Sequence, residues 1–410
     1  MITQKLNSNG EWIDPNAFEI VDQLQDGGHT CYLVGGCIRD HLAGVEAKDF
    51  DVATSALPQQ IKKRVRRAFI IGKRFRLVLV YRGVIQYEVA TFRRNATVEE
   101  LKNEDCQADN LFGSPKEDAQ RRDFTVNALF YDPSTNEVID YVDGLSDIKK
   151  QYIRIIGDPA ARLEEDPIRI LRGIRLSHKL NFTIEPKLRE QIVAKKEFLL
   201  SSAAPRRRED FVKILKLATS YNALIEAYDL GVLEICFPII TEALTEENID
   251  SFRTYMYRYE EVEIDFKEPK NILCIFVFCF LKSISDESDF PLEALTDRIE
   301  TAFKQELGIF KGELEYIRSC IGLIDSLKET DKFSRRGERR KIAFVKNDFF
   351  DLSLELAIWD QQLTGEEIVF WMKEKHKYID LPQIKTQTPK RKPKSKNFNK
   401  NRKPKNSKQY

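Results

Sequence analysis

The apolar residues in the first third of the chain occur in short runs separated by Gly, Pro and polar residues. Residues 31–34 are one such run and end at Gly35 and Gly36, after which polar and apolar residues alternate in a way that fits a helix up to Leu42. Residues 50–54 form the next run. Short apolar runs bounded by turn residues are typical of strands, so the pattern predicts two strands with a helix between them.

A second pair of apolar runs flanks a turn. Residues 77–81 and 84–92 lie on either side of Arg82 and Gly83, and a glycine-containing pair between two such runs indicates a β-hairpin. Together with the two preceding strands, the hairpin predicts a small mixed sheet with helices.

The pattern changes to helical periodicity from about Asp158 onward. The segments with this periodicity are 167–180, 188–200, 206–217 and 221–230, and further amphipathic stretches continue to about Lys375. The longest apolar run, residues 272–281, has ten residues, about half of what a bilayer span needs. It predicts a buried helix, and we expect no membrane span.

The composition indicates a globular protein with a charged end. The 410 residues are 42% apolar and 32% charged, which suggests two or three domains. Lys and Arg (66) nearly balance Asp and Glu (65), but 11 of the cations and none of the acids lie in residues 383–410. Residues 1–382 therefore contain 55 Lys and Arg against 65 Asp and Glu, a net charge of about −10. The last segment has too few apolar side chains to fold, so we expect a disordered basic tail.

Cysteine usage and the first residues favour a cytoplasmic location. The seven cysteines form no Cys-x-x-Cys pair and lie mostly in apolar segments, which predicts buried thiols in a reducing compartment. The chain starts without the apolar core and cleavage site of a signal peptide. Since there are only four histidines, we expect no His-rich metal site or catalytic triad.

Asp49 and Asp51 lie at the start of the strand predicted at residues 50–54. Residues i and i+2 of a strand point to the same face, so the two carboxylates converge while Phe50 and Val52 face the core. Such a pair suits Mg²⁺, which is held by one or two carboxylates, waters and substrate phosphates. The alternative is a pair of solvated acids at a strand edge.

Two glycines precede this pair of aspartates in the sequence, and a third acid follows it. Gly35 and Gly36 let a phosphate approach the backbone at a helix start, and Arg39 one turn later supplies positive charge, although two glycines can also form an ordinary turn. Glu88 shares a strand face with Gln86. An acid on an inner strand needs a partner or a metal, unless its position faces the surface.

Residues 121–128 place charged and amide groups at the entrance of a helix or strand. They include Arg122, Asp123 and Asn127. A local ion pair between an arginine and the aspartate is the alternative to a binding role.

Residues 164–175 predict a capped helix with one cationic face. Pro167 fits the first helical position with Asp166 as the N-cap. Arg169, Arg172 and Arg175 recur every three residues, opposite apolar positions. The alternative is an amphipathic helix with a solvated arginine stripe.

These segments occur in the order of a known pattern, and together they span roughly residues 32–180. The matching stretches are 33–40, 49–54, 88–93, 121–128 and 165–169. They closely resemble the class II branch of the polymerase β nucleotidyltransferase superfamily, which comprises bacterial poly(A) polymerases and CCA-adding tRNA nucleotidyltransferases.

The resemblance implies an α+β fold with a small mixed-sheet head and an extended all-α neck and body. The expected parts are an N-terminal segment at 1–28, a nucleotidyltransferase head at 29–157, a helical neck with the base pocket at 158–235, an all-helical RNA-binding body at 236–382 and the disordered Lys/Arg-rich tail at 383–410.

The resemblance also implies a role for each residue of the motifs. Asp49 and Asp51 would hold two Mg²⁺ ions, with Mn²⁺ as a substitute, and Glu88 would be the third catalytic acid, which helps to activate the primer 3′-hydroxyl. The implied nucleotide-binding residues are Gly35, Gly36 and Arg39 for the triphosphate, Arg122, Asp123 and Asn127 for the ribose, Asp166 and Arg169 for the base, and Arg172 as a further one.

One segment distinguishes bacterial poly(A) polymerases from CCA-adding enzymes. In this chain it is residues 70–80, and it looks like the poly(A) polymerase version. We therefore expect template-independent addition of AMP from ATP to the 3′ ends of mRNA and small RNA. CCA addition to tRNA is the first alternative, and a non-catalytic RNA-binding protein on the same fold is the second.

Basic residues outside the nucleotide site are candidates for RNA contact, because each cation that neutralises a phosphate releases counterions. They are Lys73 and Arg74, the residues Arg335, Arg336, Arg339 and Arg340 of a basic helical segment at 333–341, and Lys390, Arg391 and Lys392 of the tail. We expect Arg206, Arg207 and Arg208 to be a solvated helix start and His178 to be structural. We expect a monomer, and protein partners such as RNA-decay factors stay open.

Overall fold

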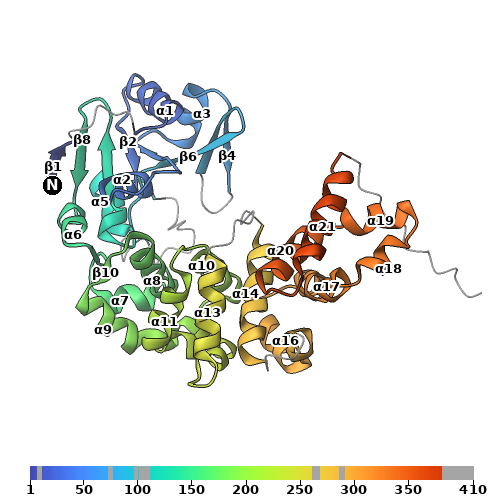
Figure 1. Ribbon diagram of the computed structural model, residues 1–410. Coiled ribbons are helices and arrows are strands. Elements are labelled where there is room, and N and C mark those ends of the chain that lie inside the picture. The colour runs from blue at the N-terminus through green and yellow to red at the C-terminus, as the bar shows by residue number, and fades with distance from the viewer. Residues whose placement is uncertain are drawn as a thin grey trace, which may run out of the picture. The chain divides into compact units, whose positions relative to one another are not determined.

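The computed structural model describes residues 1–6, 12–72, 77–96, 100, 111–260, 268–285 and 291–380. The chain divides into two compact units, residues 1–321 and 322–410. Figure 1 shows a sheet with helices at the start of the first unit, followed by helices only. This is the predicted α+β class with a mixed-sheet head. The predicted tail at 383–410 lies outside the described residues.

A mixed sheet forms the head. Within the described ranges it has eight strands in the order β1-β8-β7-β2-β3-β6-β5-β4. Their bounds are β1 Ile2–Lys5, β2 Cys31–Val34, β3 Asp51–Thr54, β4 Ala68–Ile71, β5 Leu77–Arg82, β6 Ile85–Thr91, β7 Leu129–Asp132 and β8 Glu137–Asp140. β3 and β6 are parallel, whereas the other paired neighbours are antiparallel. The hairpin of β5 and β6 turns at Gly83 and Val84, one residue later than expected, because Arg82 still pairs with Ile85.

The helices of the head pack mainly on one face of this sheet. They are α1 Pro15–Gln25, α2 Gly36–Leu42, α3 Pro58–Arg64, α5 Pro115–Arg121, the 3₁₀ turn η2 Thr125–Asn127 and α6 Gly144–Lys150. Buried residues of α1, α2 and α3 form one core with alternate residues of the strands, among them Val52, Val78 and Val89. Phe50 belongs to the same core, as predicted.

The other face of the sheet is covered only in part. A smaller core that includes Ala53, Ala119 and Phe130 covers it between α5 and strands β2, β3 and β7. The rest of this face, on β6, β5 and β4, carries the exposed side chains of Glu88 and Phe69. The face that α1 and α3 leave free is thus the one on which Asp51 and Glu88 stand.

The segment at 1–28, which the sequence analysis separates from the head, contributes to it. β1 pairs with β8 and extends the sheet at one end. Four residues of α1, Ala17, Ile20, Val21 and Leu24, are fully buried in the head core.

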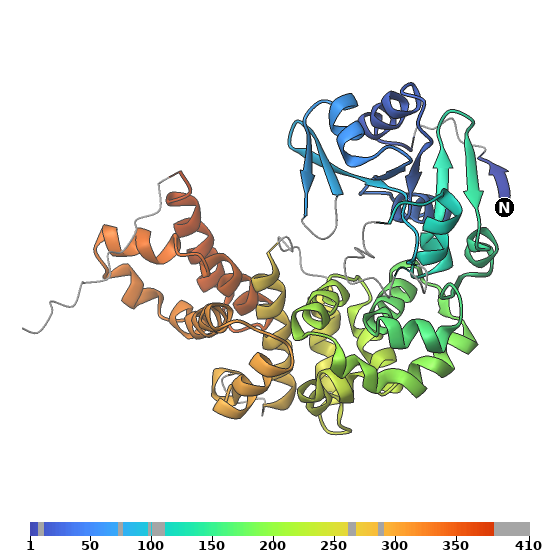
Figure 2. The same ribbon diagram turned by 180° about the vertical axis from the view of Figure 1, so that it is seen from behind.

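The rest of the first unit is helical, and it is joined to the head by a two-stranded parallel sheet of β9 and β10. Its elements are β9 Tyr152–Ile153, α7 Pro159–Glu165, α8 Ile168–Leu180, β10 Thr183–Ile184, α9 Pro186–Lys195, η3 Lys196–Ser201, α10 Ala204–Leu215, α11 Ser220–Asp229, α12 Val232–Cys236, η4 Pro238–Leu244, α13 Ile249–Glu260, α14 Pro269–Ile284, α15 Pro291–Ala294, α16 Asp297–Gln305 and α17 Lys311–Leu327, which continues into the second unit. Figure 2 shows the same succession from behind.

Two predictions for this helical part can be compared with the structure directly. The apolar run at 272–281 lies in α14, where it is fully buried, so the predicted buried helix is confirmed. The predicted helix at 188–200 is instead α9 followed by the 3₁₀ turn η3. None of the helices in the described ranges is both long and apolar enough to cross a membrane.

The second unit has its own aromatic core. Its further helices are α18 Thr330–Ser334, α19 Glu338–Val345, α20 Phe350–Trp359 and α21 Gly365–Lys377. Trp371 is fully buried, packs on Phe333, Phe344 and Phe350, and donates from Nε1 to the carbonyl of Leu327 at 2.7 Å.

The expectation of one basic helical segment at 333–341 is wrong. The segment is broken between α18 and α19, because Gly337 adopts extended backbone and caps α19.

Candidate nucleotide-binding and metal site

The parallel pairing of β3 and β6 sets Asp51 beside Glu88. Val52 pairs with Val89, and both valines are buried in the head core. Asp51 and Glu88 each precede these valines, so they lie side by side on the opposite face. Together with Asp49, they line a cavity of about 410 Å³. The structure therefore brings the three predicted acids together.

The environment of Asp51 fits an oxygen ligand of a cation. Burial, and after it the negative charge of Glu88, raises the pKa of Asp51 to about 6, and Arg122 opposes this rise. The three acids share a cavity but do not converge as ligands on one point, since no group of three or more His, Cys, Asp or Glu in the described part of the chain is placed to hold a metal ion. Two carboxylates completed by substrate phosphates remain a donor set that Mg²⁺ accepts.

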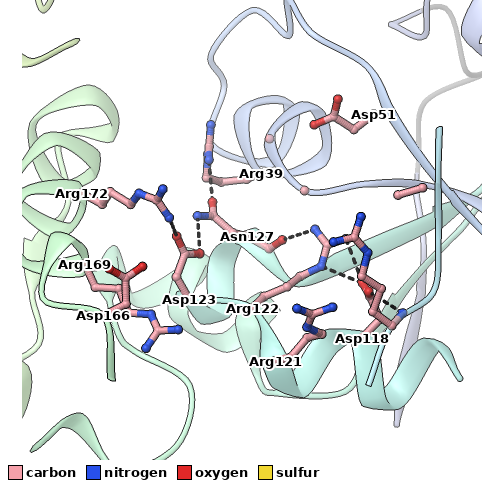
Figure 3. Close-up of a pocket in the computed structure, with 14 residues that line it drawn as sticks. Arg39, Asp51, Asp118, Arg121, Arg122, Asp123, Asn127, Asp166, Arg169 and Arg172 are labelled. Carbon is pink, nitrogen blue, oxygen red and sulfur yellow. Dashed lines mark hydrogen bonds and ion pairs between the residues drawn. The ribbon is translucent and has the colours of Figure 1, made fainter. Parts of the chain in front are cut away.

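A second cavity, of about 480 Å³, adjoins the first through Asp51. It is lined by all nine predicted nucleotide-binding residues, which are Gly35, Gly36, Arg39, Arg122, Asp123, Asn127, Asp166, Arg169 and Arg172. Figure 3 shows Asp51 at one end of this cavity and the side chains of the helical part at the other. It is thus shared between the head and α8.

Gly35 leaves space at the wall of this cavity. Its φ of 73° lies in the left-handed region that favours glycine. A Cβ atom there would stand 3.2 Å from Nη1 of Arg122. Any larger residue would strain the backbone and push that guanidinium aside.

Hydrogen bonds connect the predicted phosphate and ribose residues. Nη1 of Arg39 donates to Oδ1 of Asn127 at 2.5 Å, and Nδ2 of Asn127 donates to Oδ1 of Asp123 at 3.0 Å. Asp123 also faces Arg172 of α8 at 3.8 Å. Figure 3 shows this series of contacts from the head to the helical part. Arg39 is in addition held by Asp40, whose Oδ1 accepts from its Nε at 2.8 Å.

Three further charged residues line the cavity, namely Arg93, Asp118 and Arg121. Arg93 and Arg121 belong to the motif stretches 88–93 and 121–128 but had no predicted binding role, and Asp118 lies outside both stretches. Oδ2 of Asp118 accepts from Nε of Arg122 at 3.0 Å, and its Oδ1 accepts from the backbone N–H of Arg93 at 3.1 Å. The spacing of Asp118 and Arg122, four residues apart, could have revealed the pair.

The prediction that Asp166 caps α8 is wrong. Pro167 occupies the N-cap position and makes no side-chain cap hydrogen bond. The side chain of Asp166 turns instead towards α10, where Oδ2 accepts from Nη2 of Arg206 at 3.0 Å. Its Oδ1 is buried and has no hydrogen-bond partner among the described residues. Asp166 lines the cavity, but this oxygen is enclosed by protein and is not exposed to the cavity.

The arginine stripe of α8 is not a solvated face. Arg169 is buried and donates to the carbonyl of Arg162 at 2.5 Å. Arg172 and Arg175 both face Asp210 of α10, at 3.6 and 3.1 Å.

The expectation that residues 206–208 form a solvated helix start is confirmed only in part, because they lie in the first turns of α10 and Arg206 is exposed, but two of them form ion pairs. Arg206 pairs with Asp166, and Arg208 pairs with Glu313. His178 is structural as expected, since its Nε2 lies 2.9 Å from Oε2 of Glu226.

The candidate RNA-binding residues lie elsewhere. Arg335, Arg339 and Arg340 are exposed in the second unit, and Arg336 is half-buried with its guanidinium 4.6 Å from the ring centre of Phe344. Lys73, Arg74, Lys390, Arg391 and Lys392 are outside the ranges that the structure describes.

Two family models match the chain. Residues 31–154 match the poly A polymerase head domain, and residues 181–244 match the probable RNA and SrmB-binding site of polymerase A.

Known proteins are similar in sequence over about half of the chain. Poly(A) polymerase I of Haemophilus influenzae is 40% identical over 250 residues, which are 59% of this chain and 55% of that protein. The CCA-adding enzyme of Enterococcus faecalis is 38% identical over 205 residues, 49% of this chain and 50% of that protein. The aligned part thus spans about half the length of these relatives.

The fold agrees with these matches. The Thermotoga maritima CCA-adding enzyme complexed with tRNA superposes with a TM-score of 0.56 at 20% identity, over 94% of this chain and 88% of that one. The family models, the relatives and the fold all agree with the motifs, and residues 31–154 form a head domain of the poly A polymerase type.

Proposed function

We propose that the chain is a template-independent RNA nucleotidyltransferase that adds AMP from ATP to RNA 3′ ends. The observation that carries the proposal is the arrangement along one cavity: Asp51 at one end, Arg39 between, and Asp166 with Arg169 at the other. A nucleoside triphosphate likewise has its phosphates at one end, its ribose in the middle and its base at the other end.

The reaction joins the RNA 3′ oxygen to the α-phosphorus of ATP. That P–O bond forms while the bond between the α-phosphorus and the oxygen bridging to the β-phosphate breaks, so pyrophosphate leaves with the electron pair. The hydroxyl proton passes to Glu88 or to solvent. Positioning and charge neutralisation supply most of the catalysis in such transfers.

Asp49 and Asp51 are the residues that would hold Mg²⁺. When bound, such ions favour the deprotonated 3′ oxygen and offset the charge on the departing pyrophosphate. Glu88 stands beside Asp51 on the same face, where it can orient the attacking hydroxyl.

The remaining residues of the cavity orient the nucleotide. The guanidinium of Arg39 is fixed by Asp40 and Asn127 and is directed at the triphosphate. Arg122, Asp123 and Asn127 form a hydrogen-bonded set suited to the ribose hydroxyls. Asp166 and Arg169 line the end of the cavity that we assign to the base.

CCA addition is the competing activity, because a CCA-adding enzyme is 38% identical to this chain over 205 residues. Supplying one nucleotide at a time separates the two. With ATP alone, we expect a generic RNA to grow into a long homopolymer. Extension by CTP that stops after a few nucleotides would instead favour CCA addition. The Asp51→Ala variant, which should fold normally but lack activity, is the catalytic control.

The proposal also includes the oligomeric state, the RNA substrate and the location of the enzyme. We expect the enzyme to act as a monomer on mRNA and small RNA 3′ ends. A cytoplasmic location agrees with the burial of the described cysteines, which are Cys31, Cys37, Cys236, Cys274, Cys279 and Cys320.

A further inference from the structure

One end of the head sheet carries cations that no acid neutralises. Lys62 and Lys63 of α3 and Arg66 and Arg67 of the following turn are all exposed. None of these four side chains, which we call the basic corner, makes an ion pair within the described residues. No Asp or Glu occurs between Val52 and Tyr87, although the chain before residue 383 is negative overall.

One acid is linked to this corner through Arg82, and it is already engaged. Glu19 of α1 faces Arg82 at 3.6 Å, and the same arginine donates from Nη1 to the carbonyl of Arg66 at 2.9 Å. The basic corner therefore presents uncompensated positive charge, which attracts phosphates.

Apolar side chains stand on the edge strand β4, which directly follows the basic corner in the chain. They lie on the free face of the sheet, whereas α3 packs on the covered face, so the two groups meet only at the edge of β4. Phe69 is 54% exposed and Ile71 is 41% exposed. The ring of Phe69 meets that of Tyr81 edge to face, with 5.8 Å between the ring centres. We call these three residues the β4 platform. An exposed aromatic pair beside free cations is what single-stranded nucleic acid requires, because bases stack on rings while the cations neutralise phosphates.

Strand register places the platform on the same face as the catalytic acids. Phe69 pairs with Leu79, and Leu79 pairs with Glu88. Cross-strand partners point to the same side, so the row from Phe69 through Leu79 and Glu88 ends beside Asp51. Phe69 stands two strands from Glu88, about 10 Å at the usual strand spacing. The opposite face is closed by the core that contains Val78 and Val89.

We propose that the β4 platform and the basic corner bind the single-stranded RNA just upstream of its reacting 3′ end. This inference rests on the proposed function, which puts the 3′ oxygen at Asp51 and Glu88. Bases stack on Phe69 and Tyr81, and Lys62, Lys63, Arg66 and Arg67 contact the phosphates. The head then binds its RNA primer through base stacking and charge, without sequence specificity.

Equilibrium binding without ATP tests the surface separately from catalysis. The probe is a fluorescent single-stranded RNA of about 15 nucleotides, followed by anisotropy at several salt concentrations. The Lys62→Gln/Lys63→Gln variant should bind about tenfold more weakly, and its salt slope should fall by roughly 0.7 for each phosphate that is no longer neutralised. Phe69→Ala should weaken binding about fivefold with an unchanged slope, and Phe69→Trp should restore it.

Matched controls come from the same head. Lys149 and Lys150 are exposed at the end of α6, at the opposite end of the sheet from β4 (Figure 1). Phe18 of α1 is 44% exposed on the covered face. Lys149→Gln/Lys150→Gln and Phe18→Ala should bind RNA like the unmodified chain, within twofold. All variants change exposed side chains, and thermal melting checks that each has folded.

Two results would overturn the inference. One is unchanged RNA binding in both the lysine variant and Phe69→Ala. The other is a change of oligomeric state in Phe69→Ala with RNA affinity intact, which would make the platform a protein contact. Failure of the proposed function looks different: the unmodified chain would bind RNA through this surface and yet transfer no nucleotide from ATP.

Discussion

Nζ of Lys179 lies 2.8 Å from Oδ2 of Asp40, so the last turn of α8 is tied to the helix that carries Arg39. Asp40 is buried, and its other oxygen accepts from Nε and Nη2 of Arg39 at 2.8 and 2.6 Å. The carboxylate is therefore clamped between a cation of the helical part and the guanidinium that faces the cavity. Lys179 positions Arg39 through Asp40 and does not line the cavity itself.

Replacing Lys179 with Met should weaken ATP binding while leaving the chemistry intact. Asp40 loses one of its two partners, and Arg39 is held less firmly. A loss of about 1 kcal/mol corresponds to a KM for ATP about fivefold higher, with kcat nearly unchanged. Steady-state kinetics with varied ATP measures this, and Lys179→Arg should retain the normal KM. A fall in kcat alone would contradict the positioning role.

Replacing Asp51 with Asn should abolish the stabilisation of the fold by Mg²⁺. A ligand that binds only the native state raises the melting temperature, and Asp51 is the acid shared by both cavities. In metal-free buffer, the variant should be the more stable form at pH 8, because it lacks a buried carboxylate beside Glu88. Thermal melts with and without Mg²⁺ measure both effects. An equal Mg²⁺ shift in the two proteins would show that the ion binds elsewhere.

Replacing Arg206 with Met should reduce the preference for ATP over CTP. The ion pair of 3.0 Å holds the carboxylate of Asp166, which lines the end of the cavity assigned to the base. Without this ion pair the carboxylate is no longer fixed, and a loss of about 1.4 kcal/mol lowers the ratio of kcat/KM values about tenfold. Single-nucleotide kinetics with each triphosphate measures the ratio. Arg206→Lys, which keeps the charge, should lie between the two, and an unchanged ratio in Arg206→Met would exclude this role.

Replacing Glu226 with Gln should destabilise the fold only above acidic pH. Burial alone would raise the pKa of Glu226, but hydrogen bonds from His178 and Arg189 outweigh it and hold the pKa below the ordinary 4.5. A carboxyl with a lowered pKa stabilises the fold above its unfolded-state value and loses this effect as the pH falls through its folded-state value.

At pH 7 the Glu226→Gln variant should therefore be less stable by about 1 kcal/mol, and the difference should shrink below pH 4.5. Urea unfolding at both pH values measures this. Glu190→Gln, at an exposed position of α9, is the control and should match the unmodified chain throughout. A difference that persists at low pH would contradict the electrostatic origin.

The strands and the metal-facing acids could be predicted from the sequence because their signals are local. Alternation fixes which side of β6 carries Glu88, and the structure has Tyr87 and Val89 buried on the other side. By the same rule, Asp51 points to the opposite side of the sheet from Phe50 and Val52. Residue spacing in a strand acts over a few positions, so the sequence records it directly.

The capping of α8 illustrates where local rules end. An Asp-Pro pair at a helix start predicts an aspartate N-cap, yet the side chain of Asp166 is drawn to Arg206, forty positions away. A capping bond and a distant ion pair compete for the same carboxylate, and the packing of α10 on α8 decides between them.

By itself, the sequence determined the order of the motifs, the face of each strand and the charge of each segment, because these depend on neighbours along the chain. Only the tertiary structure decided that Lys179 holds Asp40, that Asp210 holds Arg172 and that β4 lies in line with the acids. Long charged side chains can reach several partners, and strand order depends on which apolar faces pack together. Such choices are made by the whole core at once, so no short stretch of sequence contains them.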